Sequence, residues 1–301
     1  MTGSPYYAYL VGDGDRRARR YVALSALCAV VALVLFARWL WDLPAVVQFV
    51  QQHPGQAAGS QSAGTPVWVV TLHALNLFFL AQLVASGWAI HTARRPIGHW
   101  TPRGRQRETV TLEQWFHVAL DLAWLAAGAV FVALMFSSGR WVRIVPTSWD
   151  VVPNAVSVAL AYLSLHWPAE DSWQGYNALQ LLAYFLVVFF LAPLAALTGW
   201  RLSFLWPRGR GWARLFPVEV ARKLHFAVMV LFVAFVLVHV GLIIVGGPVQ
   251  LLNHMFAAND GDSLAGVAVL CGVLALAGLA IAAARPVVIR TLAGLTGRVT
   301  R

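Results

Sequence analysis

The sequence predicts an all-α integral membrane protein with about six transmembrane helices, and two observations carry this prediction. Hydrophobic residues make up 59% of the 301-residue chain and charged residues only 11%, less than half of the roughly 25% found in soluble domains. Six apolar runs also reach the ~20 residues that are needed to cross ~30 Å of hydrocarbon. These runs are residues 21–41, 67–90, 113–137, 177–200, 218–245 and 264–284.

Two stretches between these runs are too polar or too short to cross a membrane. Residues 150–165 are apolar with polar breaks, which predicts an amphipathic helix in the membrane interface. Residues 51–66 are rich in Gln, Gly, Ser and Ala and predict a flexible external loop. We therefore expect three parts: an N-terminal arm with the first span and external loop (1–66), a four-helix core (67–250), and an additional C-terminal span with a tail (251–301).

Basic residues alternate between the two sides of the predicted spans. Arginines precede the first run and recur in the loops 91–112 and 201–217 and in the C-terminal tail. The loops 42–66 and 246–263 have none, and the longer stretch 138–176 has only two. Because short cytoplasmic loops are enriched in Arg and Lys, both termini are expected in the cytoplasm, and the chain in the inner membrane of a bacterium.

Other features of the composition exclude several classes of protein. The net charge is +10, but the arginines cluster at the ends of apolar runs and not along one face, so no nucleic-acid partner is expected. Cys28 and Cys271 lie inside apolar runs without a C-x-x-C or C-x-x-C-H pattern, which argues against covalent haem, iron–sulfur clusters and zinc on this chain alone. The first run is too long for a cleavable signal peptide, and no cleavage site follows it.

Ionisable side chains inside membrane spans are costly and mark functional sites by default. Other histidines, at span ends or in predicted loops, are expected to be solvated or interfacial: His53, His91, His99, His166 and His254. The spans themselves contain His73, His117, Asp121, His225 and His239.

The four histidines inside the spans fall at two depths. His225 and His239 are 14 residues apart, which places them on nearly the same side of one helix and about 21 Å apart along its axis. His73 lies near an outer span end, as His239 does, and His117 lies near an inner end, as His225 does. Depth thus defines an outer pair (His73, His239) and an inner pair (His117, His225). Two imidazoles at one depth on facing helices predict a haem site; a structural or proton-relay role stays open.

These segments resemble the cytochrome b (gamma) subunits of respiratory formate dehydrogenases and the related cytochrome b subunits of membrane-bound nickel–iron hydrogenases. The resemblance covers about residues 70–250. It implies a four-helix core holding two haems b, with His73, His117, His225 and His239 as axial ligands of the haem iron. It is carried by T-L-H at 71–73, Q-W-F-H at 114–117, the 14-residue spacing of His225 and His239, and G-Y-N-A-L-Q at 175–180.

The last of these motifs is associated with quinone binding in the family. The resemblance therefore implies that Asn177 and Gln180 bind menaquinone or ubiquinone beside the outer pair. The two side chains share a helix face because they are three residues apart, and amides can donate hydrogen bonds to quinone carbonyls. From the residues alone, Asn177 is better interpreted as an N-terminal helix cap.

The chain also departs from the family pattern. An extra span precedes the core and another follows it, and Ala74 stands where the family has tryptophan after the first core histidine. In the formate dehydrogenases the haem near the quinone lies close to the cytoplasm. The alternation of arginines places it near the outside in this chain.

Together these features predict the membrane-anchoring di-haem b-type cytochrome subunit of a respiratory oxidoreductase complex. It would pass electrons between the quinone pool and an iron–sulfur partner subunit docked on the cytoplasmic loops 91–112 and 201–217. The main chemistry would belong to a catalytic partner subunit, with no catalytic residue on this chain. Three alternatives stay open: a cytochrome of the ascorbate- or ferric-reductase type, a proton-coupled secondary transporter with histidine relays, and a purely structural anchor.

Overall fold

The computed structural model describes residues 5–57, 64–104, 109–167, 173–207, 211 and 216–300. Within these residues, six helices are long and apolar enough to cross a membrane, which confirms the expected all-α membrane fold. The spans are Arg20–Trp41 within α1 (Pro5–Trp41), α3 (Val67–Thr92), α4 (Leu112–Ser137), Ala178–Leu202, α9 (Val218–Val245) and α11 (Ala265–Ala283). A shorter apolar helix, α5 (Val151–Leu163), lies where an interfacial helix was expected.

Contacts between residues divide the chain into two compact units. The first unit consists of Met1–Ala58, Ser148–Glu170 and Asn177–Gln180. In it, α5 packs against α1 and against a short helix, α2 (Pro44–Gln52).

In the first unit the expected span at 21–41 is confirmed, and the start of the expected loop at 51–66 was wrong. Helix α1 begins at Pro5, well before the apolar run, because arginine is a good helix former and lets the helix continue through the charged segment. Residues 51 and 52 end α2 and are not loop; this helix has Pro44 in its first turn, where the missing N–H costs nothing. The part of the expected loop at 58–63 lies outside the described residues.

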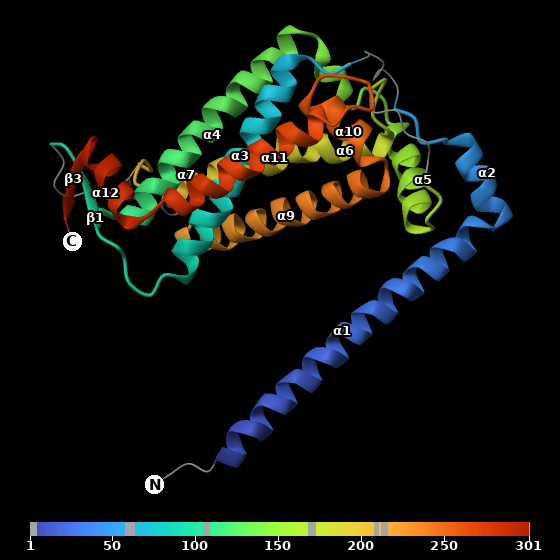
Figure 1. Ribbon diagram of the computed structural model, residues 1–301. Helices are drawn as coiled ribbons and strands as arrows, with labels where there is room; N and C mark the ends of the chain where they lie inside the picture. Colours follow the sequence, from blue (N-terminus) through green and yellow to red (C-terminus); the bar gives the residue numbers. More distant parts are fainter. Residues whose placement is uncertain are drawn as a thin grey trace. The chain divides into compact units, whose positions relative to one another are not determined.

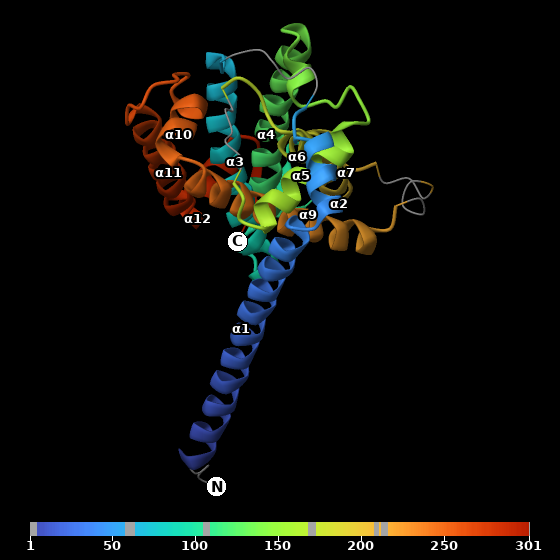
Figure 2. The same cartoon turned by 90° about the vertical axis from the view of Figure 1, so that its right-hand side faces the viewer.

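The second unit is a helical bundle (Figure 1). Helix α3 packs against α4 and α11, and α7 (Ala192–Leu202) packs against α9. Figure 2 shows α10 (Pro248–Phe256) and α11 beside α3. The fourth span consists of α6 (Ala178–Leu186), a π-helical turn η2 (Val187–Leu191) and α7. Such turns adapt a helix to an interruption, and here the interruption is Pro193, which has no N–H to donate.

A small sheet and a short helix close one end of this bundle, which we call the sheet end. Strands β1 (His99–Pro102), β2 (Val110–Thr111) and β3 (Gly297–Thr300) run in the order β2-β1-β3. Together with α12 (Pro286–Gly294) they bury a cluster built on Trp100, Leu112, Ile289 and Ala293. A Cβ at Gly297 would overlap the indole ring of Trp100 and the carbonyl oxygen of Thr101, so only glycine fits there. Helices α4 and α9 begin at this end, and α10 lies at the opposite end (Figure 1).

Candidate functional site

The structure brings the four intramembrane histidines together in the two pairs that depth predicts. The ring centroids of His73 on α3 and His239 on α9 are 6.5 Å apart. Those of His117 on α4 and His225 on α9 are 6.2 Å apart. Because an imidazole–metal bond is about 2 Å long, two imidazoles on opposite sides of one metal ion place their centroids roughly 6 Å apart. Each pair thus has the spacing that one haem iron requires.

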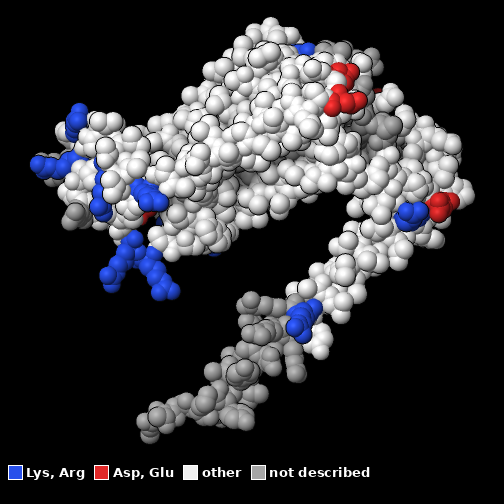
Figure 3. Space-filling model, in the orientation of Figure 1, with Lys and Arg blue, Asp and Glu red and all other residues white. Residues whose placement is uncertain are grey.

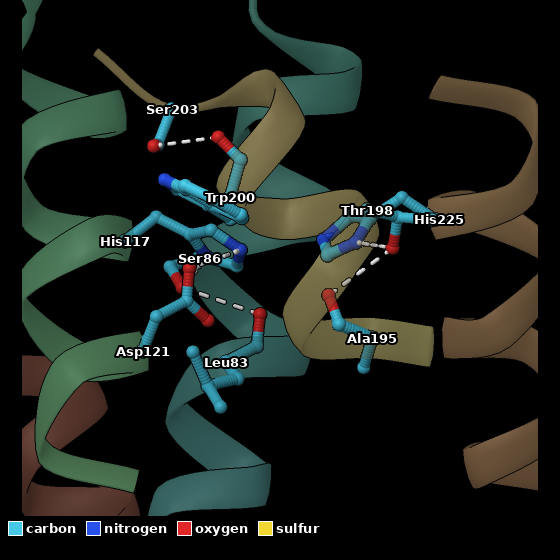
Figure 4. A network of polar contacts seen from close by, with 9 residues as sticks. All are labelled: Leu83, Ser86, His117, Asp121, Ala195, Thr198, Trp200, Ser203 and His225. Atoms are coloured by element: carbon cyan, nitrogen blue, oxygen red, sulfur yellow. Dashed lines mark hydrogen bonds and ion pairs between the residues drawn. The ribbon is translucent and has the colours of Figure 1, made fainter. Parts of the chain in front are cut away.

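Both rings of the inner pair are held by hydroxyl groups from neighbouring helices (Figure 4). Ser86 Oγ on α3 lies 2.7 Å from His117 Nδ1, and Thr198 Oγ1 on α7 lies 2.9 Å from His225 Nδ1. Each hydroxyl donates its own proton to a carbonyl one turn back, at 3.2 Å for Ser86 and 2.7 Å for Thr198. In a ring that binds a metal through Nε2, Nδ1 carries the proton, and the hydroxyl oxygen is then placed to accept from Nδ1–H. This tautomer leaves the Nε2 lone pairs available to a metal.

A glycine follows each of these hydroxyl residues and lies against the same histidine ring. A Cβ added at Gly87 would be 3.3 Å from Cε1 of His117, and a Cβ at Gly199 would be 3.3 Å from Cε1 of His225. By contrast, a Cβ at Gly128 would meet nothing within 4 Å. We call the dipeptides Ser86-Gly87 and Thr198-Gly199 the hydroxyl–glycine clamps. Sequence reasoning did not assign this role, although a hydroxyl residue followed by glycine recurs at the inner end of two spans.

The carboxyl group of Asp121 lies beside the inner pair. Asp121 Oδ2 is 3.9 Å from His117 Nε2, one helical turn away on α4, and would be 3.9 Å from a Cβ at Gly199. The distance from Asp121 Oδ2 to His117 Nε2 is too long for a hydrogen bond. The orientation of the inner rings therefore comes from the clamps and not from this carboxyl group.

The outer pair has aromatic surroundings instead. His73 meets the ring of Phe256 edge-on, with centroids 5.4 Å apart. His239 stacks on Phe235 at 5.6 Å and meets Tyr184 edge-on at 6.2 Å. Across the described part of the chain, neither outer ring has a side-chain hydrogen bond like those of the clamps. The two pairs thus differ in how their rings are held.

The two residues implied in quinone binding form a reciprocal helix cap. The Gln180 N–H donates to Asn177 Oδ1 at 2.8 Å, and the Asn177 N–H donates to Gln180 Oε1 at 3.1 Å. Asn177 Nδ2 also donates to the Tyr162 hydroxyl at 2.9 Å. This arrangement is a capping box at the start of α6, as the residues alone suggested. The role of Asn177 and Gln180 at a quinone stays a prediction.

One histidine outside the spans differs from expectation. His254 lies in α10 and not in a loop, and only 4% of it is exposed. Its Nε2 is 2.6 Å from Asp260 Oδ1, and its ring lies 5.1 Å from that of Trp173. Burial is possible because these contacts satisfy the polar ring.

Comparisons with known proteins identify the family of this chain. The family described as prokaryotic cytochrome b561 matches residues 64–258. A protein of Azospira oryzae named "Putative protein-methionine-sulfoxide reductase subunit YedZ1" is 32% identical over 187 residues, which cover 59% of this chain and 88% of that protein. No solved structure matches the chain. Since the family match spans more than half of the sequence and includes all four intramembrane histidines, the chain belongs to the prokaryotic cytochrome b561 family of membrane proteins with b-type haem.

Proposed function

We propose that this protein is the di-haem membrane subunit of a respiratory oxidoreductase complex and passes electrons between the quinone pool and an iron–sulfur partner subunit. The observation that supports this best is the spacing of the two histidine pairs, each suited to one haem iron. Their ligands on α9 are about 21 Å apart along the helix, which is most of a ~30 Å hydrocarbon core. Haem supplies one-electron chemistry when bound. The four histidines would hold the two haems.

Membership of a b-type haem family bears on the alternatives. It leaves the secondary transporter and the purely structural anchor without support, because neither requires haem. An ascorbate- or ferric-reductase type of cytochrome would use the same histidines, and no contact in the structure favours it over the proposed function.

The position of the basic side chains supports a cytoplasmic partner at the sheet end. Figure 3 shows Lys and Arg gathered over β1, β3 and α12. Dense positive charge marks cytoplasmic faces and attracts acidic protein surfaces. Five further arginines of the loops 91–112 and 201–217, at positions 105, 107, 208, 210 and 214, lie outside the described residues. Among the described residues of the loop 91–112, the start of α9 and the C-terminal segment, the exposed basic residues are Arg94, Arg95, Arg103, Arg222, Lys223, Arg285 and Arg298.

The sheet end also connects the proposed docking surface to the inner pair. Trp100 on β1 packs against Trp115 on α4, with ring centroids 6.2 Å apart. Trp115 precedes His117 by two residues. His117 lies in the first two turns of α4, so an electron that enters or leaves at this end would have a short distance to cross to the inner pair.

The quinone role of Asn177 can be tested separately from its role as a cap. Asn177→Ser keeps a good N-cap but removes the amide that would donate to a quinone carbonyl. We expect this variant to bind both haems and to lose roughly two- to tenfold in the rate of quinol-driven haem reduction, the typical cost of one hydrogen bond to a bound group. Stopped-flow absorbance with a short-chain quinol measures this rate. An unchanged rate would move the site elsewhere, first to the inner end near His117.

The clamp glycines allow a steric test of the inner haem site. Gly199→Val places methyl groups where a Cβ alone would already lie 3.3 Å from the His225 ring. We expect the inner haem to be lost, so that the haem content falls by roughly half if each chain holds two. Gly128→Val is the matched control, because a Cβ there meets nothing within 4 Å. Haem content per chain, measured after extraction, distinguishes them. Equal losses in both variants would contradict the proposed position of the inner haem.

A second candidate for the partner comes from the relative of Azospira oryzae. Its name describes a subunit of a reductase acting on methionine sulfoxide in proteins. In that case the partner would consume two electrons and two protons for each sulfoxide it converts to methionine and water. Isolation of the intact complex from native membranes distinguishes the candidates: an iron–sulfur subunit supports the first, and a reductase that repairs oxidised methionine supports the second.

A further inference from the structure

The clamps and the aromatic surroundings give the two histidine pairs different electronic character. In the inner pair, both Nδ1 atoms lie within hydrogen-bond distance of hydroxyl oxygens, at 2.7 Å and 2.9 Å, so a ring that binds iron through Nε2 donates its Nδ1–H to them. A hydrogen bond accepted from the distal nitrogen makes a metal-bound imidazole a more basic ligand. In the outer pair, the rings of His73 and His239 meet Phe256, Phe235 and Tyr184. Apolar aromatic surroundings disfavour additional charge on the bound iron.

These differences act on the two oxidation states of haem iron in opposite ways. Ferric iron carries one more positive charge than ferrous iron, so more basic axial ligands stabilise the ferric state and lower the reduction potential. Low polarity around a buried site favours the form with less charge and raises the potential. The clamps lower the reduction potential at the inner pair, and the aromatic rings around the outer pair raise the reduction potential there. Both effects place the potential of the inner site below that of the outer site.

We infer that the hydroxyl–glycine clamps make the inner haem the lower-potential haem, so that electrons run from the inner pair to the outer pair. This rests on the proposed function, which places one haem at each pair. A haem held by His117 and His225 would be oxidised as it passes each electron to a haem held by His73 and His239, which would be reduced. Two such electrons and two protons convert a quinone at the outer end to quinol. The partner at the sheet end is then the electron donor.

The contacts of Ser86 and Thr198 indicate that they act on the histidines and are not only packing groups. Each hydroxyl already satisfies its proton within its own helix, so the helix does not need the histidine. The histidine, in contrast, needs an acceptor for Nδ1–H inside the membrane. The same solution occurs twice, on α3 toward His117 and on α7 toward His225.

A redox titration tests this inference on the purified full-length protein, with mediators and without quinone or partner. We expect two b-type components, and the component missing from His117→Ala to have the lower midpoint potential. Ser86→Ala and Thr198→Val should shift that component to higher potential and leave the other in place. Thr198→Ser keeps the hydroxyl and should stay close to wild type.

A matched control removes a hydroxyl from the same helix without touching a histidine. Thr92 at the end of α3 donates to the carbonyl of Trp88 at 2.8 Å, so Thr92→Val should shift neither component. If Ser86→Ala fails to bind haem, the order of the two midpoint potentials in the wild-type protein still tests whether the inner haem has the lower potential. A higher potential at the inner haem, or equal shifts of both components in the clamp variants, would overturn the inference. A single component in protein that holds two haems would also overturn the inference, whereas protein that holds fewer than two haems would instead contradict the proposed function.

Discussion

Replacing His225 with alanine should remove the inner haem and leave the outer haem in place. Haem content should fall from about two per chain to about one, because a bis-histidine site that loses one axial ligand no longer holds its iron on both sides. His117→Ala should deplete the same spectral component. His73→Ala and His239→Ala should deplete the other. Reduced-minus-oxidised spectra of the four purified variants make this comparison directly.

A control for loss of a histidine is available on α3 itself. His91 is exposed, and its ring stacks on Phe226 at 4.8 Å and not on a histidine of either pair, so His91→Ala should keep full haem content. The pairing would be wrong if His73→Ala and His225→Ala depleted the same component. That outcome would place one haem between residues at different depths.

Turnover of the intact complex should be electrogenic. A quinone that reacts near the outer end and a partner that docks at the sheet end require electrons to cross most of the membrane. Moving one charge through 100 mV changes its free energy by about 2.3 kcal/mol. Electron flow from partner to quinone should therefore dissipate a membrane potential that is negative inside, and flow in the opposite direction should generate one.

Sealed vesicles of known orientation make this measurable. A potential-sensitive dye should respond when electron donor and quinone are both supplied. An imposed potential should change the turnover rate, and an uncoupler should abolish both effects. The orientation itself can be checked with a protease that reaches the Arg-rich loop 91–112 from one side only. Turnover that neither generates nor responds to a potential would place quinone and partner on the same side.

The spans and the histidine pairs could be predicted from the sequence because simple periodic rules govern both. A helix rises by a fixed amount per residue, so the length of an apolar run gives a span, and the position of a histidine within it gives a depth. His225 and His239 share one helix, which set the depth of both pairs. Their partners followed because His73 and His117 lie near opposite ends of their own spans.

The clamps and the sheet end could not be predicted in the same way, because they depend on contacts between distant segments. Residue 300 pairs with residue 99, and four-residue strands carry almost no periodic signal. Thr198 lies in the fourth span, and its contact with His225 depends on the rotation of α7 relative to α9. A sequence gives a residue's depth in a span more readily than the direction in which its side chain points.

The capping box at Asn177, unlike the clamps, could be predicted from the local sequence. Its cap was expected from local chemistry alone, since a capping residue acts on a backbone N–H three residues away. A quinone site depends on how several segments enclose a ligand. Resemblance to a family is therefore the source of that prediction, and the Asn177→Ser variant is its test.

The haem content of the purified wild-type chain shows directly whether each histidine pair holds one haem. Pyridine haemochrome absorbance gives the haem type, and quantitative amino-acid analysis of the same sample gives the number of chains. We expect haem b that is extracted without covalent attachment, with about two haems per chain. A ratio near one would mean that only one histidine pair holds iron, and protein that is folded in the membrane but binds no haem would contradict the account as a whole.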